Sequence, residues 1–438
     1  MTRVLVISND SVGEQMAGAG IRAYELARAL QPHATVTLAA VRSPHRPPPG
    51  IDVRPYHPID QRALRPLIAE ADAIVCQPQW AVTASWLRHS RARLVFDVYN
   101  PEPFETLEFL RERSRLLRST LHTLTVDRYL GAFHDAHHLM CSSGKQRDLW
   151  LGAMLAERLI GPELYDRDPS LLSVIDTVPF GLPALPPTPG GHPGIRARFP
   201  QIGADDEIVL WNGGLWNWLD GPTAVRAIDL LARRRPGVRL VFMGASAVGP
   251  AKAATEATRR VAAELGRLDE HVFFNSEWVP YAARGSWLLE ADCSVSTHVE
   301  HLETRFAFRT RLLDCFWAGL PVVCTRGDDL SERVERDDLG ATAAQRDPEA
   351  LAAALERVLE RGRAAFAPQL AATAEEFRWS RVAEPLVRWV TAPEPPVRIG
   401  GGTRERLAWR AGHRLRSGSY RTARSTLNAL GIRDWPKL

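Results

Sequence analysis

Short apolar runs alternate with helical patterns along most of the chain, and this alternation limits the possible folds more than any other feature. Residues 4–7 are apolar at every position, as in a strand that is buried on both faces. Residues 20–30 then place their apolar side chains on one face of a helix. Further strands are predicted at 35–38, 73–76, 94–99 and 138–141. This order predicts a parallel sheet covered by helices on both faces.

A stretch rich in proline and glycine divides the chain. Residues 178–194 (VPFGLPALPPTPGGHPG) suit neither a helix nor a central strand and are typical of a semi-rigid linker. A second strand–helix series follows, with strands predicted at 208–211, 238–243, 271–275, 293–297 and 321–325. The sequence therefore predicts an α/β fold with two Rossmann-like, doubly wound parallel-sheet domains facing a cleft. We expect an N-terminal domain at 1–181, a linker at 182–194, a C-terminal domain at 195–375, a helix crossing back towards the first domain at 376–392, and a basic tail at 393–438.

The positive charge of the chain is concentrated in this tail. The 438 residues have a formal net charge of +4, but residues 403–438 hold nine basic and two acidic side chains, so the rest is slightly negative. The nearly neutral whole argues against a dedicated nucleic-acid binder. Leucine and tryptophan alternate with arginine in the tail, as in helices that lie on anionic membranes. A solvated helix and a nucleic-acid arm are the alternatives, and no known nucleic-acid-binding motif accompanies the second.

The remaining composition indicates a cytoplasmic protein. The five cysteines form no C-x-x-C pair, which favours reduced thiols. The N-terminus lacks the apolar stretch of a signal peptide, and no apolar run approaches the ~18–20 residues that span a bilayer. We expect a cytoplasmic protein whose tail contacts the inner face of the membrane.

A glycine-rich loop precedes the first predicted helix. Gly18-Ala19-Gly20 begins a G-x-G-x-x-A pattern, but about ten residues separate it from the first strand, and no acidic residue follows the second strand. Both features argue against a dinucleotide fold that binds NAD. The loop favours backbone amides that approach a phosphate at a helix N-terminus, and the alternative is a simple turn.

The segment 301–325 (HLETRFAFRTRLLDCFWAGLPVVCT) carries the most chemistry. It places Glu303, Arg305 and Arg309 after a predicted strand and Asp314 one turn inside a helix. Ligands bind at the carboxyl ends of parallel strands, and arginine suits phosphate oxygens. The alternative is a solvated helix start with weak Glu–Arg pairs. Three neighbours, His298, Glu300 and His301, lie on one unbraced loop and predict a mobile polar loop rather than a metal site.

This segment resembles the carboxylate-containing tract of the retaining glycosyltransferases of family 4, which have the GT-B fold. Three other stretches resemble the same family in order and spacing. They are its glycine loop at 11–20, its interdomain hinge at 175–183 and the opening of its donor domain at 208–231. Together these stretches span about residues 1–390.

The resemblance implies transfer of a sugar from a nucleotide-diphosphate-sugar donor to a glycan, lipid-linked or small-molecule acceptor. The anomeric configuration would be retained, and no dedicated metal or other cofactor would be needed. The catalytic residues implied are Glu303, which positions the sugar, and Asp97 on the acceptor side. The donor-binding residues implied are Gly18 and Gly20 at phosphate or sugar; Gly213, Gly214, Arg309 and Arg311 at the diphosphate with Arg305 behind them; Asp314 at ribose; and Trp278 and Val279 beside the base.

The sequence departs from the family pattern at three places. One lies at residues 94–104, where Asp97 or Tyr99 stands instead of the catalytic-site histidine that family members often have. Phe306 and Asp314 stand where the family has two glutamates, and Trp216, Trp218 and Asp220 stand where it has an arginine and a lysine. A nucleotide-sugar epimerase or a phosphorylase on the same fold is therefore an alternative, as is a GT-B-like binding scaffold without turnover. An oxidoreductase that uses NAD is disfavoured by the glycine loop.

Overall fold

The computed structural model describes residues 1–43, 46–189, 192–245, 251–392 and 398–399. They form two compact units, one of Met1–Pro179 with the described residues from Val382 onward, and one of Phe180–Arg381. Of the predicted basic tail at 393–438, only residues 398 and 399 are among the described residues. No helix of the described part is long and apolar enough to cross a membrane.

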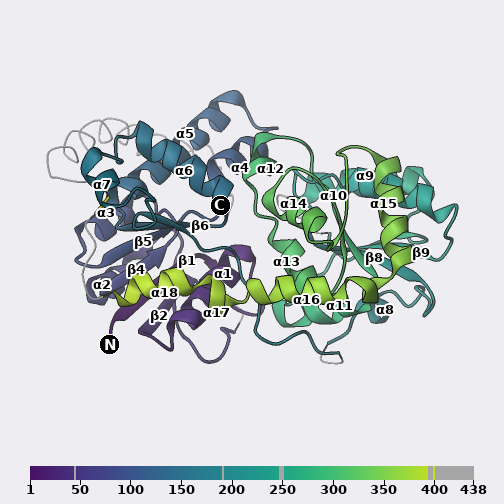
Figure 1. The fold of residues 1–438 in the computed structure, drawn as a ribbon, viewed down its shortest axis with the longest axis horizontal. Coiled ribbons are helices and arrows are strands. Elements are labelled where there is room, and N and C mark those ends of the chain that lie inside the picture. Colours follow the sequence, from purple (N-terminus) through teal and green to yellow (C-terminus); the bar gives the residue numbers. More distant parts are fainter. Residues whose placement is uncertain (44–45, 190–191, 246–250, 393–397, 400–438) are drawn as a thin grey trace. The chain divides into compact units, whose positions relative to one another are not determined.

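Unit 1 is built on a seven-stranded parallel sheet in the order β3-β2-β1-β4-β5-β6-β7, with helices on both faces (Figure 1). Its strands are β1 (Arg3–Ser11), β2 (Thr35–Val41), β3 (Asp52–Tyr56), β4 (Ala73–Cys76), β5 (Arg93–Asp97), β6 (His138–Cys141) and β7 (Ile175–Thr177). Its helices are α1 (Gly18–Leu30), α2 (Leu64–Glu70), α3 (Ala81–His89), α4 (Glu102–Phe109), α5 (Arg115–Asp135), α6 (Gly144–Ala156), α7 (Pro162–Arg167) and α18 (Glu384–Thr391).

Every residue of strands β4 and β6 is buried, so both faces of these strands are covered. Leu5, Ile74 and Leu139 are at most 2% exposed and belong to one continuous core. Helix α18 closes this unit from the far end of the chain. The Arg93 guanidinium donates to the carbonyls of Val390 and Ala392 at 2.6 and 3.0 Å.

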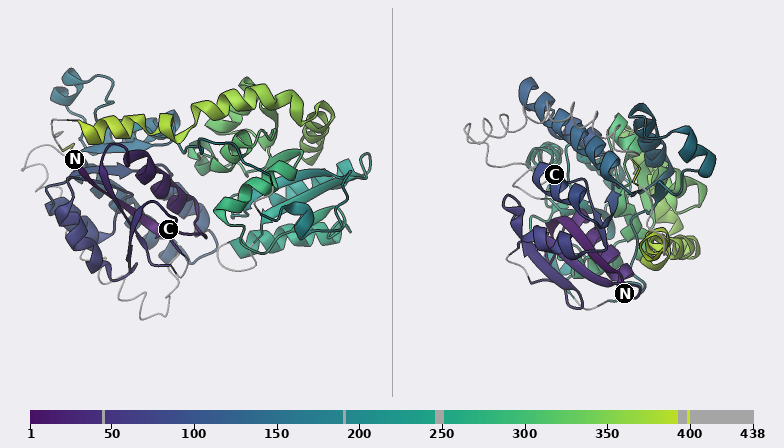
Figure 2. Two further views of the ribbon diagram at one scale, coloured as in Figure 1. Left: turned by 90° about the horizontal axis from the view of Figure 1, so that it is seen from below. Right: turned by 90° about the vertical axis from the view of Figure 1, so that its left-hand side faces the viewer.

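Unit 2 is built on a six-stranded parallel sheet in the order β10-β9-β8-β11-β12-β13, again between helices (Figures 1 and 2). Its strands are β8 (Glu207–Gly214), β9 (Val238–Gly244), β10 (Val272–Phe274), β11 (Cys293–Ser296), β12 (Val322–Thr325) and β13 (Gly340–Ala343). Its helices are α8 (Ile195–Arg198), α9 (Gly221–Ala232), α10 (Lys252–Glu264), α11 (Arg284–Glu290), α12 (Leu302–Phe306), α13 (Thr310–Trp317), α14 (Asp329–Arg336), α15 (Pro348–Arg361), α16 (Ala367–Glu376) and α17 (Trp379–Val382), whose last residue belongs to unit 1.

Local sequence signals set the ends of these helices. Asp220 caps α9 by accepting from the Thr223 amide at 3.1 Å. Helix α13 is terminated by Gly319, two residues beyond its last residue, where φ is +63°. The Gly319 amide donates to the Phe316 carbonyl, and the Leu320 amide donates to the Cys315 carbonyl. This pair of hydrogen bonds is a Schellman motif, and it confirms Gly319 as the predicted helix stop.

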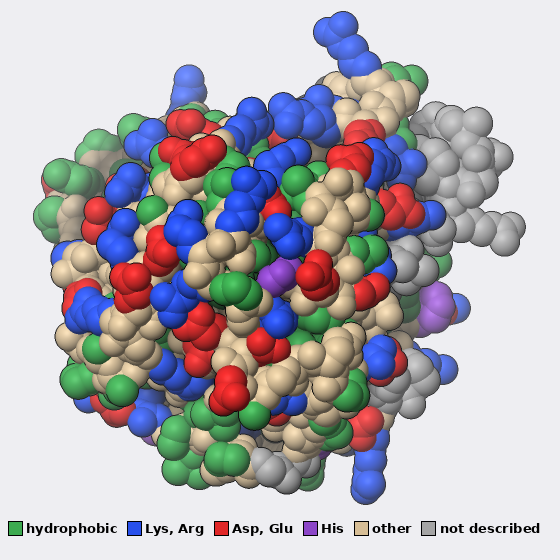
Figure 3. All heavy atoms as spheres, turned by 90° about the vertical axis from the view of Figure 1, so that its right-hand side faces the viewer, with side chains coloured by type: hydrophobic (Ala, Val, Ile, Leu, Met, Phe, Trp, Pro, Cys, Tyr) green, Lys and Arg blue, Asp and Glu red, His purple; other side chains and the backbone are tan. Residues whose placement is uncertain are grey.

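The surface of unit 2 mixes both signs of charge. On the face shown in Figure 3, Lys and Arg side chains are interspersed with Asp and Glu rather than gathered in one patch. This pattern agrees with the nearly balanced charge of the chain outside its tail.

Candidate functional site

Polar side chains of unit 2 gather where β8, β11 and β12 end. β8 closes with Gly213 and Gly214, the polypeptide continues from β11 into His298, and β12 leads to Asp328. Because the strands are parallel, their carboxyl ends share one edge of the sheet. This edge is therefore where a ligand of unit 2 is expected to bind.

Arg311, in the first turn of α13, is the charged group most available to such a ligand. Its Nη2 donates to the Gly214 carbonyl at 3.0 Å, while its Nη1 is shielded from solvent and has no hydrogen-bond partner among the described residues. Burial, together with the like charge of Arg309, lowers the pKa of Arg311 to about 10. An anion bound to this guanidinium would accept a hydrogen bond from Nη1 and would lower the free-energy cost of its buried positive charge.

The backbone beside Arg311 is shaped by glycine. Gly213 has a φ of +100°, a backbone angle that residues other than glycine rarely adopt. A Cβ on Gly213 would lie 3.7 Å from the Arg311 guanidinium carbon. Glycine therefore leaves room at the point where the predicted diphosphate residues Gly213, Gly214 and Arg311 come together.

Arg309 is placed differently from Arg311. It is 4% exposed and forms an ion pair with Asp328, which is fully buried. It also donates to the carbonyls of Ser296 and Thr325 at 3.3 and 2.6 Å. Burial lowers the pKa of Arg309, but the Asp328 carboxylate more than offsets this, so the pKa is raised. Arg309 thus ties the ends of β11 and β12 together, and its contact with a diphosphate stays a prediction.

Glu303 and two histidines lie in the same region. Glu303 on α12 is 3% exposed, and its carboxylate is 3.6 Å from Nδ1 of His301, which caps the helix by accepting from the Thr304 amide. His298 is 2% exposed. The charges of Arg309 and Arg311 both act on its imidazole. The structure thus brings together Glu303 and Arg311, which were predicted as site residues, with His298, which was not.

The other predicted donor residues of unit 2 lie in different surroundings. Asp314 is half-buried and accepts from Nε of Arg284 at 3.1 Å. Trp278 is 52% exposed, the neighbouring Val279 is half-buried, and Arg305 on α12 is exposed. Arg284 occupies only one oxygen of the Asp314 carboxylate, and the ribose role of Asp314 and the base contacts of Trp278 and Val279 stay predictions.

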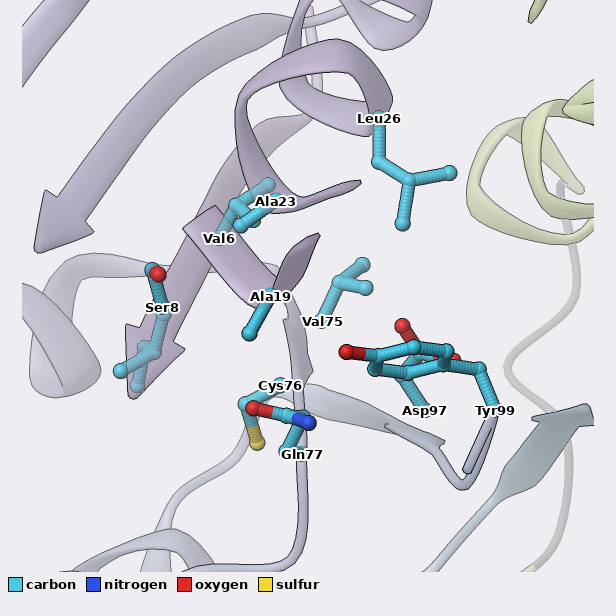
Figure 4. Close-up of a pocket in the computed structure, with 11 residues that line it drawn as sticks. Val6, Ser8, Ala19, Ala23, Leu26, Val75, Cys76, Gln77, Asp97 and Tyr99 are labelled. Carbon is cyan, nitrogen blue, oxygen red and sulfur yellow. The ribbon is translucent and has the colours of Figure 1, made fainter. Parts of the chain in front are cut away.

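In unit 1, Asp97 forms a buried two-pronged pair with Arg22. Nε and Nη2 of Arg22 donate to the two carboxylate oxygens at 2.6 and 2.9 Å, and Nη2 also reaches the Val178 carbonyl. Burial raises the pKa of Asp97, and Arg22 opposes that shift. Figure 4 shows Asp97 and Tyr99 at the edge of a small recess that Ala19 of α1 also lines. Asp97 therefore braces this recess, and its acceptor-side role stays a prediction.

The two predicted glycines at the start of α1 differ in their surroundings. A Cβ on Gly20 would lie 2.4 Å from the Ser11 carbonyl oxygen, whereas one on Gly18 would meet nothing within 4 Å. Ala17 provides no side-chain cap, and the first turn holds no acidic residue. The glycine at 20 is thus required by the close approach of the backbone, and the amides of the first turn are left for another acceptor.

A second set of buried polar groups follows β5 in unit 1. Glu102 forms an ion pair with Arg128 and accepts from the Tyr129 hydroxyl at 3.2 Å. Nearby, Glu105 accepts from the Asn100 amide at 2.9 Å. Burial raises the pKa of Glu105 to about 7, against the effect of Asn100 and with a contribution from Glu102. Glu105 therefore holds a proton that an exposed glutamate would release.

Sequence reasoning missed Asp328, Arg22 and Glu105, and it wrongly assigned His298 to a mobile polar loop, whereas His298 is 2% exposed and its amide donates to the Thr325 hydroxyl. Asp328 is recognisable as a helix cap, but its ion pair with Arg309 depends on the packing of two strand ends. Arg22 and Asp97 are 75 residues apart, so no local pattern joins them. His298 could have been found as the polar residue that follows a buried strand at the ligand edge. Within the described residues, no group of three or more His, Cys, Asp or Glu side chains could hold a metal ion.

Comparison with known proteins agrees with this fold. Residues 206–361 match the family model described as "Glycosyl transferases group 1", which covers most of unit 2. No curated protein matches the sequence.

Similar solved structures span nearly the whole chain at low identity. Sucrose-phosphate synthase from Thermosynechococcus elongatus is 15% identical with a TM-score of 0.58, over 88% of this chain and 97% of its own. Alr3699/HepE from Anabaena, in complex with UDP-glucose, is 15% identical with a TM-score of 0.63, over 88% and 99%. The trehalose-6-phosphate synthase OtsA is 12% identical with a TM-score of 0.60, over 90% and 100%. The predicted fold class is confirmed: the chain has the GT-B fold, carries a group 1 glycosyltransferase domain at 206–361, and is a glycosyltransferase.

Proposed function

We propose that the chain transfers a sugar from a nucleotide-diphosphate sugar to the hydroxyl of a glycan, lipid-linked or small-molecule acceptor, with retention of the anomeric configuration. The observation that carries this proposal is Arg311, a shielded cation with an unsatisfied Nη1 beside the Gly213–Gly214 backbone. A diphosphate supplies the anionic oxygens that this position lacks. The complex of HepE with UDP-glucose supports a nucleotide sugar as the donor class.

In the proposed reaction, the bond between the anomeric carbon and the diphosphate oxygen breaks as the acceptor oxygen bonds to that carbon from the same face. The acceptor's proton passes to the departing phosphate oxygen. Arg311 and the nearby amides stabilise the charge that develops on the diphosphate, which is the largest electrostatic demand of the step. Arg309 holds the strand ends in place through Asp328, and Glu303 orients the sugar. We propose that this arrangement operates without a dedicated metal.

Ligand-induced stabilisation tests the donor class. Thermal unfolding of the full chain should be measured with UDP, GDP and dTDP and with UDP-glucose, GDP-mannose and dTDP-glucose, each with and without EDTA. A ligand at a hundred times its Kd stabilises the native state by about 2.7 kcal/mol. We expect one nucleotide pair to raise the Tm, also in EDTA. No shift with any pair would contradict the proposal and favour a scaffold.

The stereochemistry and the acceptor need their own measurement. Proton NMR of the transfer product should show the anomeric configuration of the donor, and the opposite configuration would refute retention. Conversion of the sugar nucleotide into another in the absence of any acceptor would instead identify an epimerase.

We also propose that residues 403–438 attach the enzyme to the cytoplasmic face of an anionic membrane and so bring it to a lipid-linked acceptor. The support is compositional: nine basic residues and two acidic ones, interleaved with leucine and tryptophan. Flotation with vesicles of phosphatidylglycerol and phosphatidylcholine should recover the full chain but not a 1–402 truncation. Equal recovery of both would refute this attachment.

A further inference from the structure

His298 is held at the ligand edge of unit 2 by its main chain. Its amide donates to the Thr325 hydroxyl at 2.9 Å, and its backbone forms an isolated antiparallel bridge with Leu219. It is 2% exposed, and its Nδ1 is shielded from solvent without a hydrogen-bond partner in the part of the chain that the structure describes.

The surroundings of His298 keep its imidazole neutral. Burial lowers the pKa of His298 far below its usual value, and the positive charges of Arg309 and Arg311 and the neighbouring His301 lower it further. A neutral imidazole has one N–H donor and one acceptor nitrogen. His298 therefore offers a hydrogen bond without adding a third positive charge to the site.

The type of group that fits Nδ1 follows from this state. A phosphate oxygen only accepts hydrogen bonds, so it fits Nδ1 only in the tautomer that carries the proton there, and Arg311 already offers it a stronger donor. A hydroxyl both donates and accepts, so it fits Nδ1 in either tautomer. Buried polar atoms without a partner are uncommon in native proteins, and each requires an explanation.

We propose that Nδ1 of His298 hydrogen-bonds a hydroxyl of the donor's sugar and so selects which sugar the enzyme accepts. This inference rests on the proposed function, because it places the diphosphate on Arg311. His298 is then a specificity-determining residue that distinguishes the sugar nucleotide from the free nucleotide. Arg311, by contrast, contributes equally to both.

The test compares three variants of the full chain. His298→Leu removes the hydrogen bond, His298→Asn places an amide near the position of Nδ1, and His271→Leu is the matched control. His271 is also buried in unit 2, but it precedes β10 at the opposite end of the strands and hydrogen-bonds the Val238 carbonyl through Nδ1. Thermal unfolding without ligand first shows that each variant is folded.

Isothermal titration calorimetry then gives the Kd of the nucleotide and of its sugar conjugate for the pairs UDP and UDP-glucose, GDP and GDP-mannose, and dTDP and dTDP-glucose. For the pair that the wild type binds, we expect His298→Leu to weaken the sugar nucleotide about tenfold, as for one lost hydrogen bond, and the nucleotide less than about twofold. His298→Asn should restore most of the loss, and His271→Leu should leave the ratio unchanged.

The outcomes separate this inference from the proposed function. If the wild type binds a pair but His298→Leu weakens nucleotide and sugar nucleotide equally, or not at all, the sugar contact is refuted while the proposed function stands. If the wild type binds none of the pairs, the proposed function is refuted and this inference falls with it. A loss in both leucine variants would show a general packing effect and would also refute the sugar contact.

Discussion

Replacement of Arg311 by methionine should stabilise the unliganded protein while it removes nucleotide binding. Burial and the like charge of Arg309 lower the pKa of Arg311 to about 10, so its surroundings disfavour the charge by about 3 kcal/mol. The substitution also removes the hydrogen bond to the Gly214 carbonyl, which contributes about 1 kcal/mol. Methionine keeps most of the apolar volume. The expected net effect is stabilisation by about 2 kcal/mol.

Urea unfolding of the full chain at pH 7, with and without the nucleotide identified by the binding panel, measures both effects. Arg226→Met is the matched control, because Arg226 is exposed on α9 of the same unit and its replacement should change stability by less than about 0.5 kcal/mol. We expect Arg311→Met to be more stable than wild type without ligand and to gain nothing from the nucleotide. A destabilised Arg311→Met protein that still responds to the nucleotide would refute the assignment of Arg311 as a strained, anion-binding cation.

Three further predictions test other parts of the structure. In the native protein the pKa of Glu105 is about 7, against 4.5 for an ordinary glutamate, so the free energy of unfolding should fall as the pH rises from about 4.5 to 7. Glu105→Gln should remove this pH dependence and stabilise the protein at pH 8 by up to about 3 kcal/mol. Urea unfolding measured across this pH range tests both. Gly20→Ala should lower the Tm markedly, while Gly18→Ala should leave it unchanged or slightly higher, and equal shifts in differential scanning calorimetry would contradict the close approach at residue 20. Asp328→Ala should cost about 3–5 kcal/mol in chemical unfolding because it leaves Arg309 buried without its carboxylate, and a cost below about 1 kcal/mol would show that the pair is not needed.

The fold could be predicted from the sequence because its signals are local. An apolar run such as residues 4–7 followed by a helical pattern needs only its own residues to be recognised, and the same holds for Gly319 at the end of α13. The predicted strands at 73–76 and 138–141 match β4 and β6 residue for residue. Repetition of these local units was then enough to give two parallel sheets.

The candidate site was only partly predictable because charge pairing is decided in three dimensions. The sequence placed Arg309 and Arg311 two residues apart with the same expected role, but the fold gives Arg309 a buried carboxylate and leaves Nη1 of Arg311 unsatisfied. Asp314 was likewise given a ligand role, whereas packing supplies it with Arg284. A spacing argument identifies which residues reach the edge of a sheet and not which of them are already paired there.

The position of α18 has a consequence for how this protein is made. Unit 1 receives its last helix only after all of unit 2 has been translated, since Arg93 and His138 bind or stack against residues 389–392. At about 5–20 residues per second, the roughly 210 residues between Pro179 and α18 take about 10–40 s to synthesise. During that interval the first sheet lacks one of its covering helices, whereas unit 2 emerges as one uninterrupted segment. A chain truncated before residue 384 and released from the ribosome should therefore hold a complete second unit and an incomplete first one.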